Sequence, residues 1–325
     1  MASSNSWDYS LTAAQVIAAA YEDLGTIAPG DTPATALSNM ALARLNMLVK
    51  QLQGNSDRAP GLKIHTRQRI NLWLAKGQQT YLVGPASGDA RSATSWGRTT
   101  ISADEAASQT VLSITSNTDT TTFPGSTITM TASDIVGIEL NDGTIQWTTI
   151  SGTPASTMTV ANALTAAASA GNYVWWFTSR AQRFPLIEAA VLRDENYNDS
   201  PLEIYTEVAQ YDAGVSSKYA DGTPTAILVE PLRTQTRITC NSQPTDVTKT
   251  IVLTVLYPAE DYDATSNDIA FPQEYLRFLV NELAFMLPAS VGNYTPKMEA
   301  NRKESAEWAR SLNPENSTAY FQSGT

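Results

Sequence analysis

The pattern that most constrains this fold is an alternating segment that breaks off near residue 85 and resumes near residue 183. Residues 68–74 and 78–83 alternate apolar and polar side chains on both sides of Ala75-Lys76-Gly77, which predicts a β-hairpin. Residues 85–179 then contain no lysine and are rich in Thr and Ser. The strand-like run RFPLIEAAVL begins only at Arg183. The sequence therefore predicts an insertion into the loop that follows the hairpin.

The inserted segment is predicted to be an all-β sandwich or barrel over residues 87–180. Asn141-Asp142-Gly143, between VGIEL and TIQWTTI, predicts a tight hairpin turn because Asn, Asp and Gly tolerate positive φ. Short strand-like runs separated by turn residues are typical of small sandwiches and barrels. The predicted strands are 99–102, 110–115, 126–131, 136–140, 144–150, 157–160 and 173–178.

The rest of the chain is predicted to form a discontinuous base domain from residues 1–86 and 181–312, followed by a C-terminal arm, 313–325. Thr12 and Gln15 predict a capping box at the start of the first helix, which Gly25 ends. The predicted fold class is α+β: a helical base domain with a small antiparallel sheet that carries the inserted β domain. Helices are expected at 11–24, 33–53, 271–287 and 299–312, and strands at 185–192, 202–207, 225–230, 236–240 and 250–257.

Charge and cysteine content restrict the function classes. The chain has 32 acidic and 21 basic residues, so it is not expected to hold DNA by neutralising phosphates. The single cysteine, Cys240, excludes an intrachain disulfide and is expected to be a buried thiol. We find no basic, apolar leader and no run of ~18 apolar residues, so neither a signal peptide nor a membrane span is predicted. We expect the chain to fold in a reducing cytoplasm.

No catalytic, cofactor or metal site is predicted. His65 is the only histidine, and one His without a Cys partner does not supply the usual zinc ligands. Phosphate-binding and nucleophile-elbow glycine motifs are missing from the sequence. The acidic run at 260–268 lacks the EF-hand spacing and is interpreted as a solvated loop before a helix, and the run at 194–199 is interpreted as a solvated hairpin turn. We therefore expect no enzyme, although a pair of carboxylates facing each other across a cleft would support a hydrolase.

Adjacent tryptophans are the strongest candidates for a contact site. Trp175 and Trp176 lie on one predicted strand and must point to opposite faces of it. Unless a loop covers it, at least one ring is therefore expected outside the core of the insert, in a packing role or as a contact for a neighbouring subunit, a carbohydrate or a partner protein. Tyr320 and Phe321, in the polar C-terminal arm, are further candidates for subunit or partner contact.

Six segments of the base resemble, in order, the head-to-tail adaptor proteins of short-tailed phages. RLNML at 44–48, GQQTY at 77–81, PLE at 201–203, GTP at 222–224 and P-x-x-Y at 272–275 match the family pattern. The gap between Gly88-Asp89 and Arg183 is far longer than is typical of that family. DGTIQWTTISG at 142–152, inside the gap, is similar to modules in phage virion proteins. The six segments are 41–52, 61–84, 183–212, 222–231, 250–263 and 271–292.

The resemblance implies a structural virion protein at the head–tail junction, assembled in the host cytoplasm. Copies would form a ring, expected to be dodecameric, beneath the portal protein. The ring would extend the DNA channel without specific DNA binding, and present an attachment surface to a downstream tail or nozzle protein. Helices before residue 55 and after residue 270 would form the ring wall, and the insert would project outward. The alternative is a tail-associated module whose insert recognises a carbohydrate or receptor.

Overall fold

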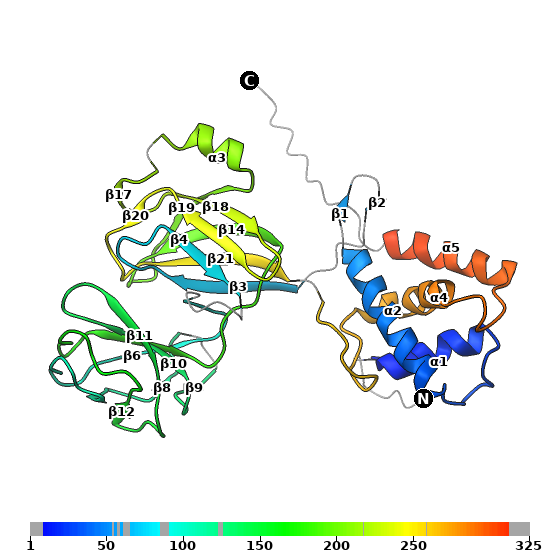
Figure 1. Cartoon of the computed structure of the whole chain (residues 1–325), viewed down its shortest axis with the longest axis horizontal. Coiled ribbons are helices and arrows are strands. Elements are labelled where there is room, and N and C mark those ends of the chain that lie inside the picture. The colour runs from blue at the N-terminus through cyan, green and yellow to red at the C-terminus, as the bar shows by residue number, and fades with distance from the viewer. Residues whose placement is uncertain are drawn as a thin grey trace, which may run out of the picture. The chain divides into compact units, whose positions relative to one another are not determined.

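The computed structural model describes residues 9–53, 55–56, 59–60, 66–84, 91–122, 126–216, 218–257 and 259–311. The chain divides into two compact units, which are drawn in Figure 1. The helical unit belongs to Met1–Thr66 and Pro258–Thr325, and the β unit is Arg67–Tyr257. His65, Gly88-Asp89, Tyr320, Phe321 and the arm 313–325 lie outside the described residues.

The helical unit is built from both ends of the sequence. The predicted capping box is present, because the Thr12 backbone N–H donates to the Gln15 side chain over 2.9 Å and the Gln15 N–H donates to the Thr12 hydroxyl. Gly25 follows the first helix with φ +67°. α4 packs against the other three helices, so its buried face forms the centre of the core. The elements are α1 (Ala13–Asp23), α2 (Thr35–Gln53), β1 (Asn55–Ser56), β2 (Ala59–Pro60), η1 (Gln273–Tyr275), α4 (Leu276–Met286) and α5 (Pro296–Ser311).

The base of the β unit is a sandwich of two sheets. One sheet has the order β15-β14-β21-β3-β5 and the other β16-β18-β19-β4. Apolar side chains of both sheets meet in one core, as alternation along the strands requires. The strands are β3 (Thr66–Trp73), β4 (Thr80–Val83), β5 (Ser92–Ala93), β14 (Leu186–Arg193), β15 (Asp199–Pro201), β16 (Glu203–Tyr205), β18 (Ala226–Pro231), β19 (Thr236–Cys240) and β21 (Thr250–Tyr257). The remaining base elements are α3 (Val208–Gly214), β17 (Asp221–Gly222) and β20 (Gln243–Pro244).

The predicted hairpin at 68–83 is wrong in its pairing. β3 lies between β21 and β5, whereas β4 pairs with β19 in the opposite sheet. Ala75-Lys76-Gly77 therefore carries the chain across the sandwich core, with Gly77 at φ +72°. The Tyr81 hydroxyl accepts a hydrogen bond from the Ala75 N–H over 3.0 Å and holds this arch closed. The alternation of apolar and polar residues correctly predicted which side chains of β3 and β4 face the core, but it does not determine which strand pairs with each of them.

The insert forms its own layers against the outer face of the five-stranded sheet. Its main sheet has the order β11-β10-β13-β6, and the hairpin predicted at Asn141-Asp142-Gly143 joins β10 to β11. One face of this sheet covers a core that includes Val136, Ile138 and Val174. The strands are β6 (Gly97–Thr100), β7 (Val111–Ser113), β8 (Thr118–Asp119), β9 (Ile128–Thr129), β10 (Ile135–Glu139), β11 (Ile145–Thr149), β12 (Thr157–Thr159) and β13 (Tyr173–Phe177). Every predicted strand of the insert has a counterpart, and β8 is additional.

The predicted fold class, a helical base domain with a small antiparallel sheet and an inserted β domain, is wrong. Strand residues outnumber helical ones, 32% to 24%. The helices form a compact unit separate from the base sheets, with the unit boundaries at 66/67 and 257/258. The physical reason is that the sandwich sheets cover each other and bury their apolar faces without a helix, while the helices bury theirs among themselves.

Candidate functional site

A layer of aromatic rings lies between the insert and the five-stranded sheet. Trp73 of β3 stacks on Phe177 of β13 with ring centroids 5.4 Å apart and an interplanar angle of 13°. Trp147 and Trp96 meet Trp73 edge-on at 5.3 and 5.5 Å. Such offset and edge-to-face pairs contribute beyond their buried area. We call Trp73, Trp96, Trp147, Trp175 and Phe177 the aromatic layer.

The two predicted contact tryptophans do point to opposite faces of β13. Trp176 is 1% exposed and belongs to the core of the insert, whereas Trp175 is 4% exposed and belongs to the aromatic layer. The ring outside the core of the insert therefore packs against the base of the same chain. Neither ring is a contact surface for a sugar or a neighbouring subunit while the insert is packed on the sheet.

Glycines opposite two of the tryptophans make room for the indole rings. Gly97 of β6 pairs with Trp176 of β13, and a Cβ at Gly97 would lie 2.2 Å from an indole carbon of Trp176. Gly137 of β10 pairs with Trp147 of β11, and a Cβ there would lie 2.8 Å from that ring. Each indole thus lies flat across a glycine of the neighbouring strand, where no side chain is in the way. These contacts position Trp176 and Trp147 on the insert sheet.

A charged residue closes the rim of the aromatic layer. The Arg98 guanidinium lies between two rings, 4.9 Å from the centroid of Tyr173 on the insert and 5.0 Å from that of Tyr197 on the base. Cation–π contacts of this kind are attractive within about 6 Å. A shallow pocket opens beside this stack, and Trp175 forms part of its wall. Arg98 is thereby a direct polar connection between insert and base.

The turn between β14 and β15 is built to present Tyr197. Tyr197 has φ +63°, an unusual conformation for an aromatic residue. The Asp194 carboxylate accepts hydrogen bonds from the backbone N–H groups of Asn196 and Asn198, over 2.9 and 2.8 Å, and so holds the turn. The hairpin turn predicted at 194–199 is confirmed by the pairing of β14 with β15, but the contact between Arg98 and Tyr197 was not predicted. The Asn- and Asp-rich turn was the available signal, because such residues stabilise turns with positive φ.

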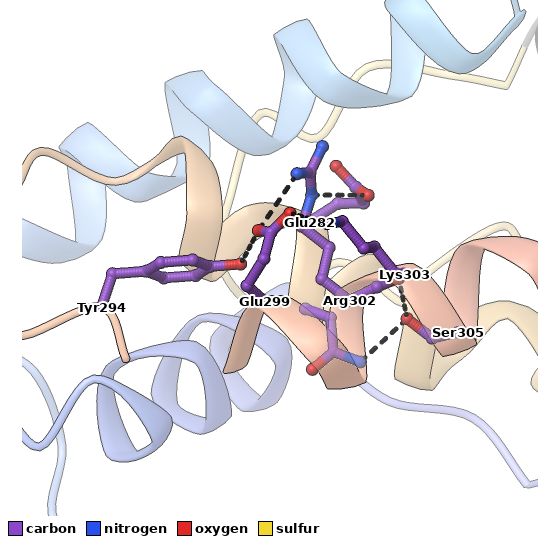
Figure 2. A network of polar contacts seen from close by, with 7 residues as sticks. Glu282, Tyr294, Glu299, Arg302, Lys303 and Ser305 are labelled. Carbon is purple, nitrogen blue, oxygen red and sulfur yellow. Dashed lines mark hydrogen bonds and ion pairs between the residues drawn. The ribbon is translucent and has the colours of Figure 1, made fainter. Parts of the chain in front are cut away.

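A polar network connects α4 and α5 in the helical unit (Figure 2). Arg302 pairs with Glu282 over 3.0 Å and with Glu299 over 3.5 Å. The Tyr294 hydroxyl donates to Glu299 over 3.0 Å, and burial together with this bond raises the pKa of Tyr294 to about 12. The Arg302 guanidinium also lies 3.7 Å from the centroid of the Phe285 ring. The network fixes an aromatic and charged surface on one flank of α5.

Large apolar side chains are exposed on this unit. Phe285 is 47% exposed, Trp308 48% and Met47 54%. Trp308 follows Arg302 by six residues, which places the two side chains about 120° apart round α5. The helical unit therefore has one exposed aromatic residue on α4, Phe285, beside Arg302, and another, Trp308, on a different flank of α5.

The RLNML motif has a structural role in the helical unit. Asn46 accepts from the Tyr262 N–H and donates to the Tyr262 carbonyl, both over 2.8 Å. Arg44 donates to the Met286 carbonyl over 2.7 Å, at the C-terminal end of α4. Lys50 donates to the Ala259 carbonyl over 2.8 Å. α2 thus fixes both the segment that enters α4 and the end of that helix.

The acidic runs do not gather into a metal site in the parts of the chain that the structure describes, where no group of three His, Cys, Asp or Glu side chains has a suitable arrangement. Asp261 pairs with Lys50 over 2.8 Å, and Asp199 accepts from Arg193 over 2.7 and 2.8 Å. Among the described helices, none has both the length and the apolar character needed to cross a membrane.

No known protein family matches the sequence, and a search of curated proteins found no match.

Proposed function

We propose that the protein is a structural head-to-tail adaptor whose copies form a ring beneath a phage portal. The ring, expected to be dodecameric, would continue the DNA channel without binding specific DNA and would offer its far side to a tail or nozzle protein. The proposal depends on the ordered resemblance of six sequence segments. One structural observation supports it: the helical unit carries two separate exposed aromatic residues, Phe285 of α4 beside Arg302 and Trp308 of α5.

A ring requires two different patches on each copy. Contacts in a closed ring are heterologous, so one flank of a subunit meets the other flank of its neighbour. Phe285 beside Arg302 supplies one aromatic patch and Trp308 the other. Trp, Phe and Arg are among the side chains enriched where proteins bind each other. The patch of Phe285 and Arg302 and the patch of Trp308 are therefore the proposed subunit contacts.

Mass measurement of the purified protein, alone and with its portal ring, tests this function. We expect monomers alone and a ring of about twelve copies on the portal, the stoichiometry that the resemblance implies. Trp308→Ser and Phe285→Ser should each abolish ring formation, because both side chains are about half exposed and open to a neighbour. Trp308→Ser should leave the melting temperature nearly unchanged, whereas Phe285→Ser also removes the contact with Arg302 and should lower it slightly.

Val111→Ser is the matched control, since Val111 is 52% exposed on the insert and belongs to the other compact unit. It should leave ring formation intact. A protein that ignores the portal and sediments as a lone trimer contradicts the adaptor function. A ring that forms normally in both the Phe285→Ser and the Trp308→Ser variants leaves the adaptor function standing and refutes the proposed contacts.

A further inference from the structure

The insert has a complete hydrophobic core of its own. Its core on one face of β10 and β13 contains Trp176, Val136, Ile138 and Val174, each at most 1% exposed. None of the residues of this core comes from the base sandwich. The base sandwich likewise has a separate core between its two sheets. Contact between insert and base is therefore made by the aromatic layer and its rim, and neither core depends on that contact.

The aromatic layer contains polar atoms without partners among the described residues. These are the indole nitrogens of Trp73 and Trp147, and on the same face of β3 the side-chain oxygen of Asn71. A buried polar group without a partner forfeits the hydrogen bonds that it makes to water. Water entering the layer would satisfy all three groups. Burial of these unpaired polar atoms therefore destabilises the closed contact between insert and base, and it does so more than in either of the two flanking cores.

The stack of Arg98 with Tyr173 and Tyr197, which we call the rim stack, stabilises the closed contact at its solvent-exposed edge. Arg98 on the insert contacts Tyr197 on the base, and the Asp194-stabilised turn holds Tyr197 at φ +63° toward it. The Arg193 guanidinium lies 5.8 Å from the Tyr197 ring centroid and pairs with Asp199. The turn is therefore supported from the base side, while Arg98 is the group that the insert contributes.

We infer that the insert is a hinged module that leaves the base as a folded unit, and that the Arg98–Tyr197 contact is its latch. Opening separates the aromatic layer and wets its three orphaned polar atoms while both cores stay closed. Two connecting segments, 94–95 and 178–180, are the hinge because they join the insert to the base and their residues belong to neither core and not to the aromatic layer.

Thiol accessibility distinguishes hinged opening from global unfolding within one molecule. Cys240 is 0% exposed in the base core and serves as the internal reference. Val247→Cys and Ala93→Cys place a second thiol on the base side of the aromatic layer, where the native residues are 3% and 0% exposed. Ile145→Cys places one on the insert side of the same layer. Labelling by an aromatic disulfide reagent is followed by mass spectrometry without denaturant and at low urea.

We expect thiols in the layer to react at least about tenfold faster than Cys240, at rates that depend only weakly on low urea. Arg98→Gln should raise the labelling of layer thiols about two- to fivefold, the change expected for loss of one exposed cation–π contact, and leave Cys240 unchanged. Arg67→Gln, which removes the exposed Arg67–Glu188 pair elsewhere on the sheet, is the control and should change neither rate.

Three results would overturn the inference. If the layer thiols and Cys240 react at one rate, the insert separates only on global unfolding. If the thiol of the Val247→Cys variant reacts quickly while those of the Ala93→Cys and Ile145→Cys variants react as slowly as Cys240, only the loop before β21 opens. If Arg98→Gln leaves every rate unchanged, the rim stack is no latch. Circular dichroism confirms the fold of each variant, and the three labelling sites provide alternatives if one substitution prevents folding.

Discussion

Gly97→Ala is the substitution for which the structure predicts the clearest loss of stability. An added Cβ would lie 2.2 Å from one indole carbon of Trp176 and 2.4 Å from the next. Optimal carbon–carbon contact is about 3.5–4.0 Å, so the ring or strand β6 must move by more than ~1 Å. Trp176 is 1% exposed and cannot turn into solvent.

Overpacking of a core costs about 1–3 kcal/mol, and this site should lie at the upper end because a strand and a rigid ring meet there. For a unit of this size a loss of about 3 kcal/mol lowers the melting temperature by roughly 6–12 °C. Urea unfolding followed by circular dichroism measures the free energy of unfolding directly. Gly222→Ala is the matched control, since no atom lies within 4 Å of that Cβ and its φ is not positive.

A double-mutant cycle identifies the cause of the loss. Trp176→Leu alone leaves a cavity and should cost about 2–4 kcal/mol. The double variant should lose about 2 kcal/mol less than the sum of the two single losses, because the smaller side chain leaves room for the new methyl group. If Gly97→Ala unfolds within 0.5 kcal/mol of the parent (roughly the error of additivity), or if the two losses simply add, the cross-strand contact does not have the role assigned to it.

Three further outcomes are expected. Asn46→Ala removes both hydrogen bonds to the Tyr262 backbone and should cost the helical unit about 1–3 kcal/mol in urea unfolding, whereas Asn301→Ala, a change outside this contact, should cost little. Burial raises the pKa of Asp119, but hydrogen bonds from Thr122, Thr121 and Arg98 outweigh burial and lower the pKa to about 2. The stability that this carboxylate contributes above pH ~4 should therefore be lost as the pH falls from ~4 to ~2. Thermal melts should show this dependence in the parent and not in Asp119→Asn. Deleting residues 97–177, which spares β5, should leave a folded sandwich in which Trp73 is uncovered, so the protein should self-associate in sedimentation experiments. Adding Trp73→Thr should restore a monomer. If the deletion protein is unfolded, the two cores are not independent.

That deletion is narrower than a cut of the whole segment, residues 87–180, that the sequence predicts to be the insert. The wider cut removes Ser92-Ala93, which pair with β3, and the hydrogen bond from the Ala181 N–H to the Ser92 carbonyl. Strand ends that belong to the base therefore lie inside the segment that composition assigns to the insert. Composition changes gradually there, whereas hydrogen-bond pairing changes at a definite residue.

Local features were predictable because they depend on neighbouring residues alone. The Thr12–Gln15 capping box, the Asn141-Asp142-Gly143 turn and the opposite directions of Trp175 and Trp176 all follow from backbone geometry over a few positions. The buried state of Cys240 was also expected, and burial raises the pKa of its thiol to about 12.

Long-range features were decided only by the tertiary structure. Period-two alternation states that Tyr81 and Leu72 face a core, but not that they face it from opposite sheets. It states that one tryptophan leaves the core of the insert, but not that this ring joins Trp73 of the base in the aromatic layer. Pairing and packing depend on which distant surfaces are complementary in shape, and no local pattern of side chains encodes that choice. The sequence by itself determined the elements and their buried faces, and the tertiary structure decided how those faces were matched.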